Sequence, residues 1–211
     1  MNHVVLLGDS IFDNAVYVPD GTPVIDHLRA VLPGGWEATL RAVDGDVVSD
    51  VQNQTALLPK SITHVVVSAG GNDALQDLGV ISESVESVAE ALLRFAEIRK
   101  GFTVKYRLML QHVLELGVPV AVCTIYNNVP GLGEIEKTAL ALYNEIILSE
   151  ATSHRLPILD LRHICSDSQD YSVISPIEPS DTGGRKIAAA IAYLLRSHDF
   201  SSRDSVVVSE G

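Results

Sequence analysis

The chain of 211 residues has the length of one domain. Its composition, with 46% hydrophobic and 20% charged residues, 15 Gly and 9 Pro, excludes a disordered polymer and a fibre. Fifteen Lys and Arg against 27 Asp and Glu give a formal net charge of -12. Because no basic run offsets this charge, nucleic acid and membranes are excluded as expected partners.

The start of the chain and its cysteines favour a cytoplasmic location. Met1 to Leu7 lacks the basic start of a signal peptide and soon reaches the polar Gly8-Asp9-Ser10. No stretch approaches the ~18 apolar residues of a membrane-spanning helix. Cys123 and Cys165 do not resemble a secreted disulfide framework, so we expect free thiols. The His residues have no zinc-ligand spacing, so we expect no metal and no other cofactor.

The first half of the chain alternates strand and helix patterns. Residues 4–7 and 64–69 are continuous apolar runs, which are typical of strands buried on both faces of a parallel sheet. Glu37–Val43 alternates apolar with polar side chains and predicts an edge strand. Helical apolar periods cover two further segments of this half, 48–58 and 85–96.

The second half continues the alternation. A helical period over 102–113 precedes the apolar run 118–125, and another over 135–146 precedes the run 157–161. A last helix carries Ile187, Ile191, Leu194 and Leu195 on one face, with Ser180 as its expected N-cap. Residues 199–211 are rich in Ser and charge, which favours a flexible C-terminal tail.

Strands that alternate with helices predict an α/β fold with right-handed crossovers. We expect three layers around a doubly wound, parallel, five-stranded sheet of flavodoxin-like order 2-1-3-4-5, because this order places the alternating strand at an edge. We expect residues 1–198 to form one domain. In such a fold ligands bind outside the carboxyl ends of the strands, so the loops that follow the strands are the candidate site.

Three of these loops carry groups suited to acyl transfer, which needs a nucleophile, donors for an oxyanion and a base. Ser10, at a predicted strand-to-helix turn, supplies a hydroxyl and a backbone N–H near a helix N-terminus. Gly45 supplies a second N–H that a substrate can approach closely, and Asn72 supplies a side-chain amide. The sequence therefore predicts a nucleophile and three oxyanion donors on one rim.

Each of these residues also has a simpler interpretation. Ser10 alone is typical of a helix cap, Gly45 of a turn, and Gly70-Gly71-Asn72-Asp73 of a strand-to-helix loop. Their occurrence after three strands, on the same predicted rim, favours a site over coincidence.

The motifs Gly8-Asp9-Ser10, Gly45 and Gly70-Gly71-Asn72-Asp73 resemble the first three sequence blocks of the SGNH (GDSL-type) hydrolase superfamily, in order and spacing. The resemblance extends from the first strand to the helix that ends near Arg196. It implies the flavodoxin-like sheet, Ser10 as nucleophile, and an oxyanion hole from the N–H groups of Ser10 and Gly45 and the amide of Asn72. It also implies hydrolysis of esters or thioesters without a metal.

The fourth block departs from the family's pattern. The family usually has Asp-x-x-His before the last helix, and its His activates the Ser. Alignment on that helix places Ser175-Pro176-Ile177-Glu178 at the motif, with Ser175 at the position of the Asp and Glu178 at that of the His.

Three hypotheses follow from this departure. Glu178 is the general base, which requires burial to raise its pKa from the ordinary value near 4.3. Alternatively His163, in the loop after the fifth strand, is the base. In the third hypothesis the protein is catalytically impaired, and binds an ester, an acetylated sugar or a carboxylate without turnover.

Other rim residues are candidates for substrate binding: Asp13, Asp73, Tyr126 and Asn127. Asp73 also fits a role in bracing its loop, and Asp13 with Asn14 is expected one turn after Ser10 on the same helix. The low aromatic content of 5% and the lack of an obvious lid insertion argue against a large lipid pocket. The sequence thus predicts a hydrolase of small carboxylic esters. It does not determine the oligomeric state.

Overall fold

Six parallel strands form the central sheet, in the order β2-β1-β3-β4-β5-β6. The computed structural model describes residues 1–202 and 204–210. The first five strands follow the predicted order, and the alternating strand β2 lies at one edge. The strands are β1 (Asn2–Gly8), β2 (Trp36–Leu40), β3 (His64–Ser68), β4 (Val120–Cys123), β5 (Ile158–Leu159) and β6 (Val207–Val208).

The strand count of five was wrong, because β6 adds a sixth strand from the segment that we expected to be a tail. The Ile158 and Asp160 N–H groups donate to the Val206 and Val208 carbonyls, both at 2.8 Å. Val208 is also buried. Without β6 the strand β5 would be a sheet edge with unpaired backbone groups, and this pairing satisfies them.

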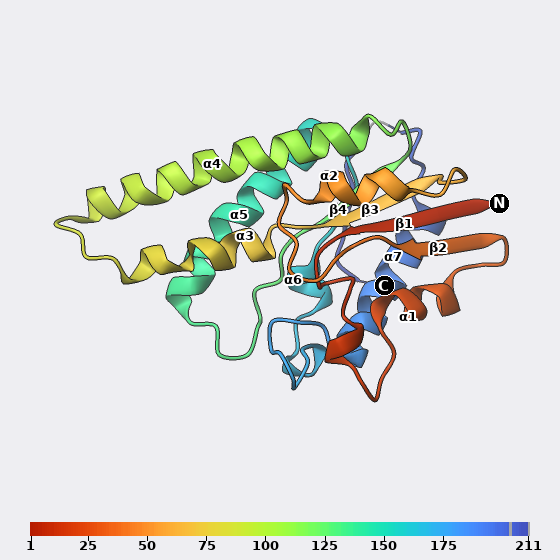
Figure 1. Cartoon of the computed structure of the whole chain (residues 1–211), viewed down its shortest axis with the longest axis horizontal. Coiled ribbons are helices and arrows are strands. Elements are labelled where there is room, and N and C mark those ends of the chain that lie inside the picture. Colours follow the sequence, from red (N-terminus) through yellow and green to blue (C-terminus); the bar gives the residue numbers. More distant parts are fainter. Residues whose placement is uncertain (203, 211) are drawn as a thin grey trace.

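Helices cover both faces of the sheet (Figure 1). The α-helices are α1 (Val24–Val31), α2 (Val51–Gln54), α3 (Gly71–Gln76), α4 (Val88–Leu114), α5 (Glu134–Ser153), α6 (Leu161–Ile164) and α7 (Asp181–Ser197). Short 3-10 helices are η1 (Ala15–Tyr17), η2 (Thr55–Leu57), η3 (Asp77–Ser82) and η4 (Ser168–Asp170). None of the helices described is long and apolar enough to cross a membrane.

The core consists of two apolar layers, one on each face of the sheet. Leu6 of β1 packs with Leu28 of α1 and Ile191 of α7 on one face. Its neighbour Leu7 packs with residues of α4 and α5, including Leu110 and Ile147, on the other. This alternation follows from the opposite directions of successive side chains in a strand. The predicted Ser180 cap of α7 is confirmed, since its Oγ accepts from the Gly183 N–H at 3.1 Å.

The largest departure from the predicted helices lies between β3 and β4. The two expected helices over 85–96 and 102–113 form the single 27-residue helix α4. Its second half packs on the sheet, but its first half extends beyond the sheet beside α3, η3 and the start of α5 (Figure 1). Val88 and Leu92 are therefore 77% and 64% exposed, and the predicted buried face is wrong there. Residues 71–82, for which the sequence analysis gave no helix, form α3 and η3.

Candidate active site

Ser10, Asn72 and Glu178 line one cavity of about 110 Å³, together with Asp9 and Tyr126. Asp9, Ser10 and Tyr126 lie in the loops after β1 and β4, Asn72 lies in the first turn of α3 after β3, and Glu178 lies in the loop before α7. The cavity therefore lies at the carboxyl edge of the sheet, where parallel sheets bind ligands.

Ser10 lies in a tight turn, and not at the start of a helix as predicted. The N–H groups of Phe12 and Asp13 both donate to the Asp9 carbonyl at 3.1 Å, which closes one turn. The chain then continues through η1, and α1 begins only at Val24. The argument from a helix dipole at Ser10 is therefore wrong, and so is the placement of Asp13 and Asn14 on a helix with Ser10. The turn itself presents the Ser10 side chain to the cavity.

The Asn72 amide is oriented by the loop that carries Gly45. Its Nδ2 donates to the Asp46 carbonyl at 2.9 Å, and because an amide has two N–H groups the second remains for a ligand in the cavity. Gly45 has φ of +86°, a conformation that favours glycine. No atom lies within 4 Å of the position that a Cβ would occupy, so its backbone is open to approach, although Gly45 is not among the residues lining the cavity.

Gln54 is a positioning residue that the sequence analysis missed. It is buried, and its side chain accepts from the Gly8 N–H at 2.8 Å and donates to the Gly8 carbonyl at 2.7 Å. Its Nε2 also donates to the Asp46 carboxylate at 2.8 Å. Gln54 thus ties the end of β1, which leads to Ser10, to the residue that orients Asn72. A polar residue beside the apolar positions of α2 was the only signal for this role.

The loop before α7 holds Glu178 by its backbone. The Ser172 N–H donates to the Glu178 carbonyl at 2.8 Å, and the Glu178 N–H donates to the Ser175 carbonyl at 2.9 Å. The Tyr126 hydroxyl donates to the Ile177 carbonyl, one residue earlier.

Asn14 supports the other side of the same loop. This buried side chain donates to the Pro179 carbonyl at 3.1 Å and accepts from the Val24 N–H at 2.9 Å. The residue after Glu178 is therefore tied to the segment that follows Ser10, so Ser10 and the Glu178 carboxyl group are held in place relative to each other.

The Glu178 carboxyl is buried and lines the same cavity as Ser10. Burial raises the pKa of Glu178 from 4.5 to about 7, an interaction with the Ser10 hydroxyl partly lowers it, and the charge of Asp44 adds to the rise. The Glu178 Oε2 atom has no hydrogen-bond partner among the described residues. A carboxylate with this pKa is about as basic as imidazole, whose ordinary pKa is about 6.5.

Asp9 is a second buried carboxyl group in the cavity. Burial raises the pKa of Asp9 to about 8, while a hydrogen bond from the Ile11 N–H lowers it and the charges of Glu178 and Asp73 raise it further. The Ile11 N–H donates to Oδ1 at 3.1 Å. At neutral pH Asp9 is therefore protonated, and Glu178 has no fixed negative charge from this neighbour.

We predict that Asp9→Asn removes a pH dependence of stability. Because the folded protein retains the Asp9 proton that the unfolded chain releases, the free energy of unfolding of the wild type falls as the pH rises from about 4 to about 8. The variant should gain more than about 1 kcal/mol relative to the wild type between about pH 4.5 and pH 8.5. Urea unfolding at both pH values measures this gain. The exposed Asp20→Asn should show none, and an Asp9→Asn variant that behaves like it would contradict a neutral Asp9.

His163 lies outside the cavity. It is in α6, its side chain is 69% exposed, and its Nε2 lies 3.9 Å from the Asp160 carboxylate. Asp160 itself is bound by Arg162 and Thr124. The structure therefore does not bring His163 to Ser10, and none of the His residues lines the cavity.

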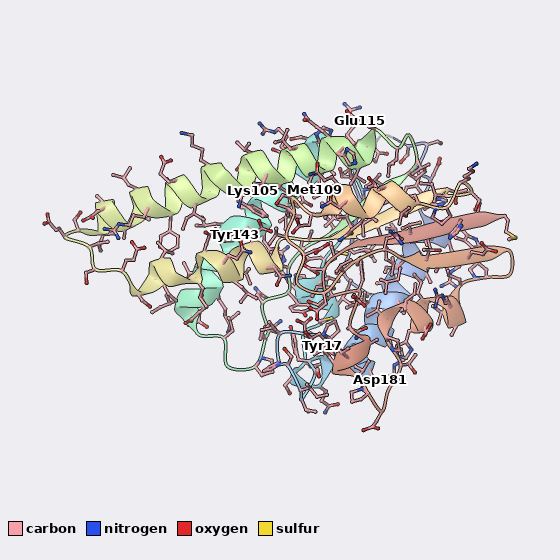
Figure 2. All side chains as sticks on the ribbon, in the orientation of Figure 1. Tyr17, Lys105, Met109, Glu115, Tyr143 and Asp181 are labelled. Atoms are coloured by element: carbon pink, nitrogen blue, oxygen red, sulfur yellow. The ribbon has the colours of Figure 1, made fainter. Side chains whose placement is uncertain are left out.

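Of the four predicted substrate-binding residues, one lines the cavity and three do not. Tyr126 lines the cavity, but Asn127 does not. Asp13 accepts from the Asp44 N–H at 3.0 Å and Asp73 accepts from the Val48 N–H at 2.9 Å, and neither lines the cavity. Lys105, labelled in Figure 2, lies 3.8 Å from Asp73. Asp13 and Asp73 thus brace the loops that carry Gly45 and Asn72.

Most of the cavity wall is apolar and comes from residues that the sequence analysis did not select. Leu75, Leu78 and Ile81 contribute from α3 and η3, and Phe95 and Leu140 from α4 and α5. Tyr143 of α5 (Figure 2) joins these elements, because its hydroxyl donates to Asp77 at 2.7 Å and its ring lies 4.7 Å from that of Phe102. The low aromatic content did not reveal this wall, since it is mainly aliphatic.

Comparison with solved structures identifies the same fold in several lipases and esterases. The extracellular lipase from Streptomyces rimosus has 17% identity and a TM-score of 0.63, over 93% of this chain and 100% of that one. Phospholipase A1 from Streptomyces albidoflavus has 22% identity and a TM-score of 0.63, over 93% of this chain and 99% of that one. A variant acetyl xylan esterase from Geobacillus stearothermophilus has 17% identity and a TM-score of 0.59, over 92% of this chain and 93% of that one.

Comparison with curated proteins gives no match. The model of the GDSL-like lipase/acylhydrolase family, however, matches residues 6–186, which include the loops of Ser10, Gly45, Asn72 and Glu178. The chain belongs to the GDSL-like lipase/acylhydrolase family.

Proposed function

We propose that the protein is a serine hydrolase of carboxylic esters in which Glu178 replaces the usual His as the general base. The observation that carries this proposal is that Ser10 and the buried Glu178 line one cavity, where the Ser10 hydroxyl lowers the pKa of the Glu178 carboxyl. Membership of a family of lipases and acylhydrolases supports the same class of reaction.

The reaction would proceed in two steps. The Glu178 carboxylate takes the Ser10 proton as Ser10 Oγ bonds to the ester carbonyl carbon, and the oxyanion is held by the N–H groups of Ser10 and Gly45 and the amide of Asn72. The bond to the leaving oxygen then breaks, and Glu178 returns the proton to the departing alcohol. Water, deprotonated by Glu178, next attacks the acyl carbon, and Glu178 gives the proton to Ser10 Oγ as the bond between Oγ and the acyl group breaks and the acid is released.

We favour this proposal over the two other hypotheses, in which His163 is the base or the site binds an ester without turnover. His163 is exposed and outside the cavity, so it is poorly placed as a base. A site that binds without turnover does not require a carboxyl group with a raised pKa against the Ser hydroxyl. The cytoplasmic location stays a prediction from the sequence.

The pH dependence of hydrolysis tests the assignment of the base. With a short-chain nitrophenyl ester, kcat/KM should rise through an apparent pKa near 7, because only the ionised Glu178 can accept the Ser10 proton. Asp44→Asn should move this rise to lower pH, because the Asp44 charge raises the pKa of Glu178. Asp20→Asn, at an exposed position, should leave it in place. A rise that disappears in His163→Ala would contradict the proposal.

A further inference from the structure

The first half of α4 carries apolar side chains that face solvent. It projects beyond the sheet, at the end of the molecule away from the termini (Figure 1). Val88, Leu92 and Leu93 are 77%, 64% and 68% exposed, and Ile135, at the start of α5, is 66% exposed. The apolar period that predicted a buried helix face is therefore present, but the described residues of this chain do not cover it.

These side chains belong to one continuous patch. Ala89 and Ala96 are also exposed, and they lie three or four positions from Leu92 and Leu93, a spacing that places residues on one face of a helix. Leu92 and Ala96 line a groove between α4 and α5 together with Ile135, which joins the start of α5 to this face. We name the six residues the α4 patch: Val88, Ala89, Leu92, Leu93, Ala96 and Ile135.

The α4 patch has the area of a subunit interface. With about 90 Å² for each large aliphatic side chain and half of that for each Ala, it exposes about 450 Å² of apolar surface. Homodimer interfaces are about 65% apolar, so this surface corresponds to about 700 Å² buried on each copy and about 1,400 Å² in all. Specific interfaces bury about 1,200 to 2,000 Å², so two copies of the patch are sufficient for a stable dimer.

The charges of α4 fit an antiparallel second copy. From Glu83 to Leu93 the chain has acidic residues and no Lys or Arg, whereas Arg and Lys prevail from Arg94 to Arg107, with Glu97 as the exception. When two such helices lie antiparallel, the acidic end of each faces the basic part of the other. A parallel arrangement would bring like charges together, so the charge pattern favours the antiparallel one.

Glu86 and Lys100 are free for such a contact. The other two basic residues near the patch, Arg94 and Arg99, already pair with Glu residues of their own chain. Glu86 and Lys100 are exposed, and no ion pair among the described residues involves either of them. Each lies seven positions from Leu93, and seven residues of a helix span about 10 Å. A two-fold axis at Leu93 therefore brings Glu86 of each copy to Lys100 of the other.

We propose that the protein forms a two-fold symmetric dimer through the α4 patch, with the two α4 helices antiparallel, Leu93 at the axis and Glu86 beside Lys100 of the partner subunit. A two-fold interface uses the same surface on both copies, as a self-complementary charge pattern requires. Ala89 and Ala96 are small enough to let the helices approach to about 8 Å. A nucleic acid or an anionic membrane would be repelled by the net charge of -12. The dimer does not depend on the chemistry proposed for the active site.

Sedimentation velocity from about 1 to 100 μM tests the proposal, because interfaces of this size have dissociation constants in or below that range. At the highest concentration the wild type should have twice the mass of one chain. Leu93→Glu should be monomeric, because it places two carboxylates at the axis between apolar surfaces. Leu57→Glu, at a position of η2 that is 74% exposed and outside the patch, should form dimers like the wild type.

Charge reversal tests the antiparallel arrangement. Glu86→Lys and Lys100→Glu should each raise the dissociation constant of the dimer by about tenfold, because each places like charges together twice in the symmetric dimer. The double variant Glu86→Lys/Lys100→Glu should return to nearly the wild-type value, because both pairs form again with their signs exchanged. Lys60→Glu, at an exposed position outside the patch, should leave the dissociation constant unchanged.

A wild type that remains monomeric at about 100 μM would overturn the proposal, and binding of that monomer to phosphatidylcholine vesicles would assign the α4 patch to a lipid surface instead. Dimers that persist in Leu93→Glu, or that Leu57→Glu abolishes, would also overturn it. A double variant that dimerises no more tightly than the two single variants would overturn it as well.

Oxidative cross-linking decides the proposal if an acidic variant fails to fold, which its unfolding transition would show. Both native cysteines are buried, so a thiol introduced at the surface is the reactive one. Leu93→Cys should give a disulfide-linked dimer, because the axis brings the two copies of this position together. Leu57→Cys should not be cross-linked, and equal cross-linking of both variants, or of neither, would overturn the proposal.

Discussion

The Ser10→Ala variant is expected to lose ester hydrolysis by at least about a thousandfold in kcat/KM, because it lacks the hydroxyl that forms the acyl intermediate in the proposed mechanism. Ser10 is buried in a turn closed by backbone hydrogen bonds to Asp9, so removal of one oxygen should leave the fold unchanged. Initial rates with a short-chain nitrophenyl ester, together with the unfolding transition, measure both effects.

The exposed Ser49→Ala variant is a matched control and should retain the wild-type rate. Mass spectrometry provides an independent readout, since the wild type mixed with the ester should carry an acyl group on the peptide that contains Ser10. Equal hydrolysis by wild type and Ser10→Ala would remove Ser10 as the nucleophile. That result would favour a site that binds esters without turnover, with the observed rate arising elsewhere.

The second large effect is expected from Glu178→Gln, which should lower kcat by about a hundredfold to ten-thousandfold, the usual contribution of a general base. Gln keeps the shape of Glu and can still contact the Ser10 hydroxyl, but it cannot take the proton. The rise in rate near pH 7 should vanish in this variant, because the Glu178 carboxyl group that titrates there in the wild type is replaced by an amide. Stopped assays from about pH 4 to pH 9 would measure the full profile.

Glu97→Gln, on the exposed side of α4, should leave both the rate and the profile unchanged. Glu178→His should recover part of the activity lost in Glu178→Gln, because imidazole has an ordinary pKa of about 6.5 and can take the same proton. A Glu178→Gln variant with the wild-type rate and an unchanged profile would show that another group is the base.

Asp9 and Glu178, the two cavity carboxyl groups whose pKa is raised by burial, have different roles in this mechanism. Burial raises the pKa of both Asp9 and Glu178, but that of Asp9 is the higher of the two. Near neutral pH, Asp9 therefore remains protonated while Glu178 can ionise. Two carboxyl groups with separated pKa values allow one of them to act as a base without a second negative charge beside it.

Local pattern was sufficient for much of the fold. The apolar runs at 4–7, 64–69 and 157–161 predicted buried parallel strands, and the alternation over Glu37–Val43 predicted the edge strand. Both predictions were possible because the polarity of successive side chains reflects which faces of a strand are buried. The Ser180 cap was also readable, since it depends on residues within one turn. The single helix α4 and the strand β6 were not, because each depends on what lies beside it in the folded chain.

Motifs in the sequence predicted which groups could carry the chemistry: Ser10 and Asn72 after two strands, and Glu178 where the family usually has His. Which of these groups lie together depends on how the chain folds. Glu178 and His163 both follow β5 in the chain. The Ser172 N–H, bonded to the Glu178 carbonyl, and the Asn14 side chain, bonded to the Pro179 carbonyl, hold Glu178 at the cavity of Ser10, while His163 stays at the surface. The raised pKa of Glu178 and the apolar cavity wall beside it likewise arise from burial by distant elements, and burial is a property of packing that no local motif contains.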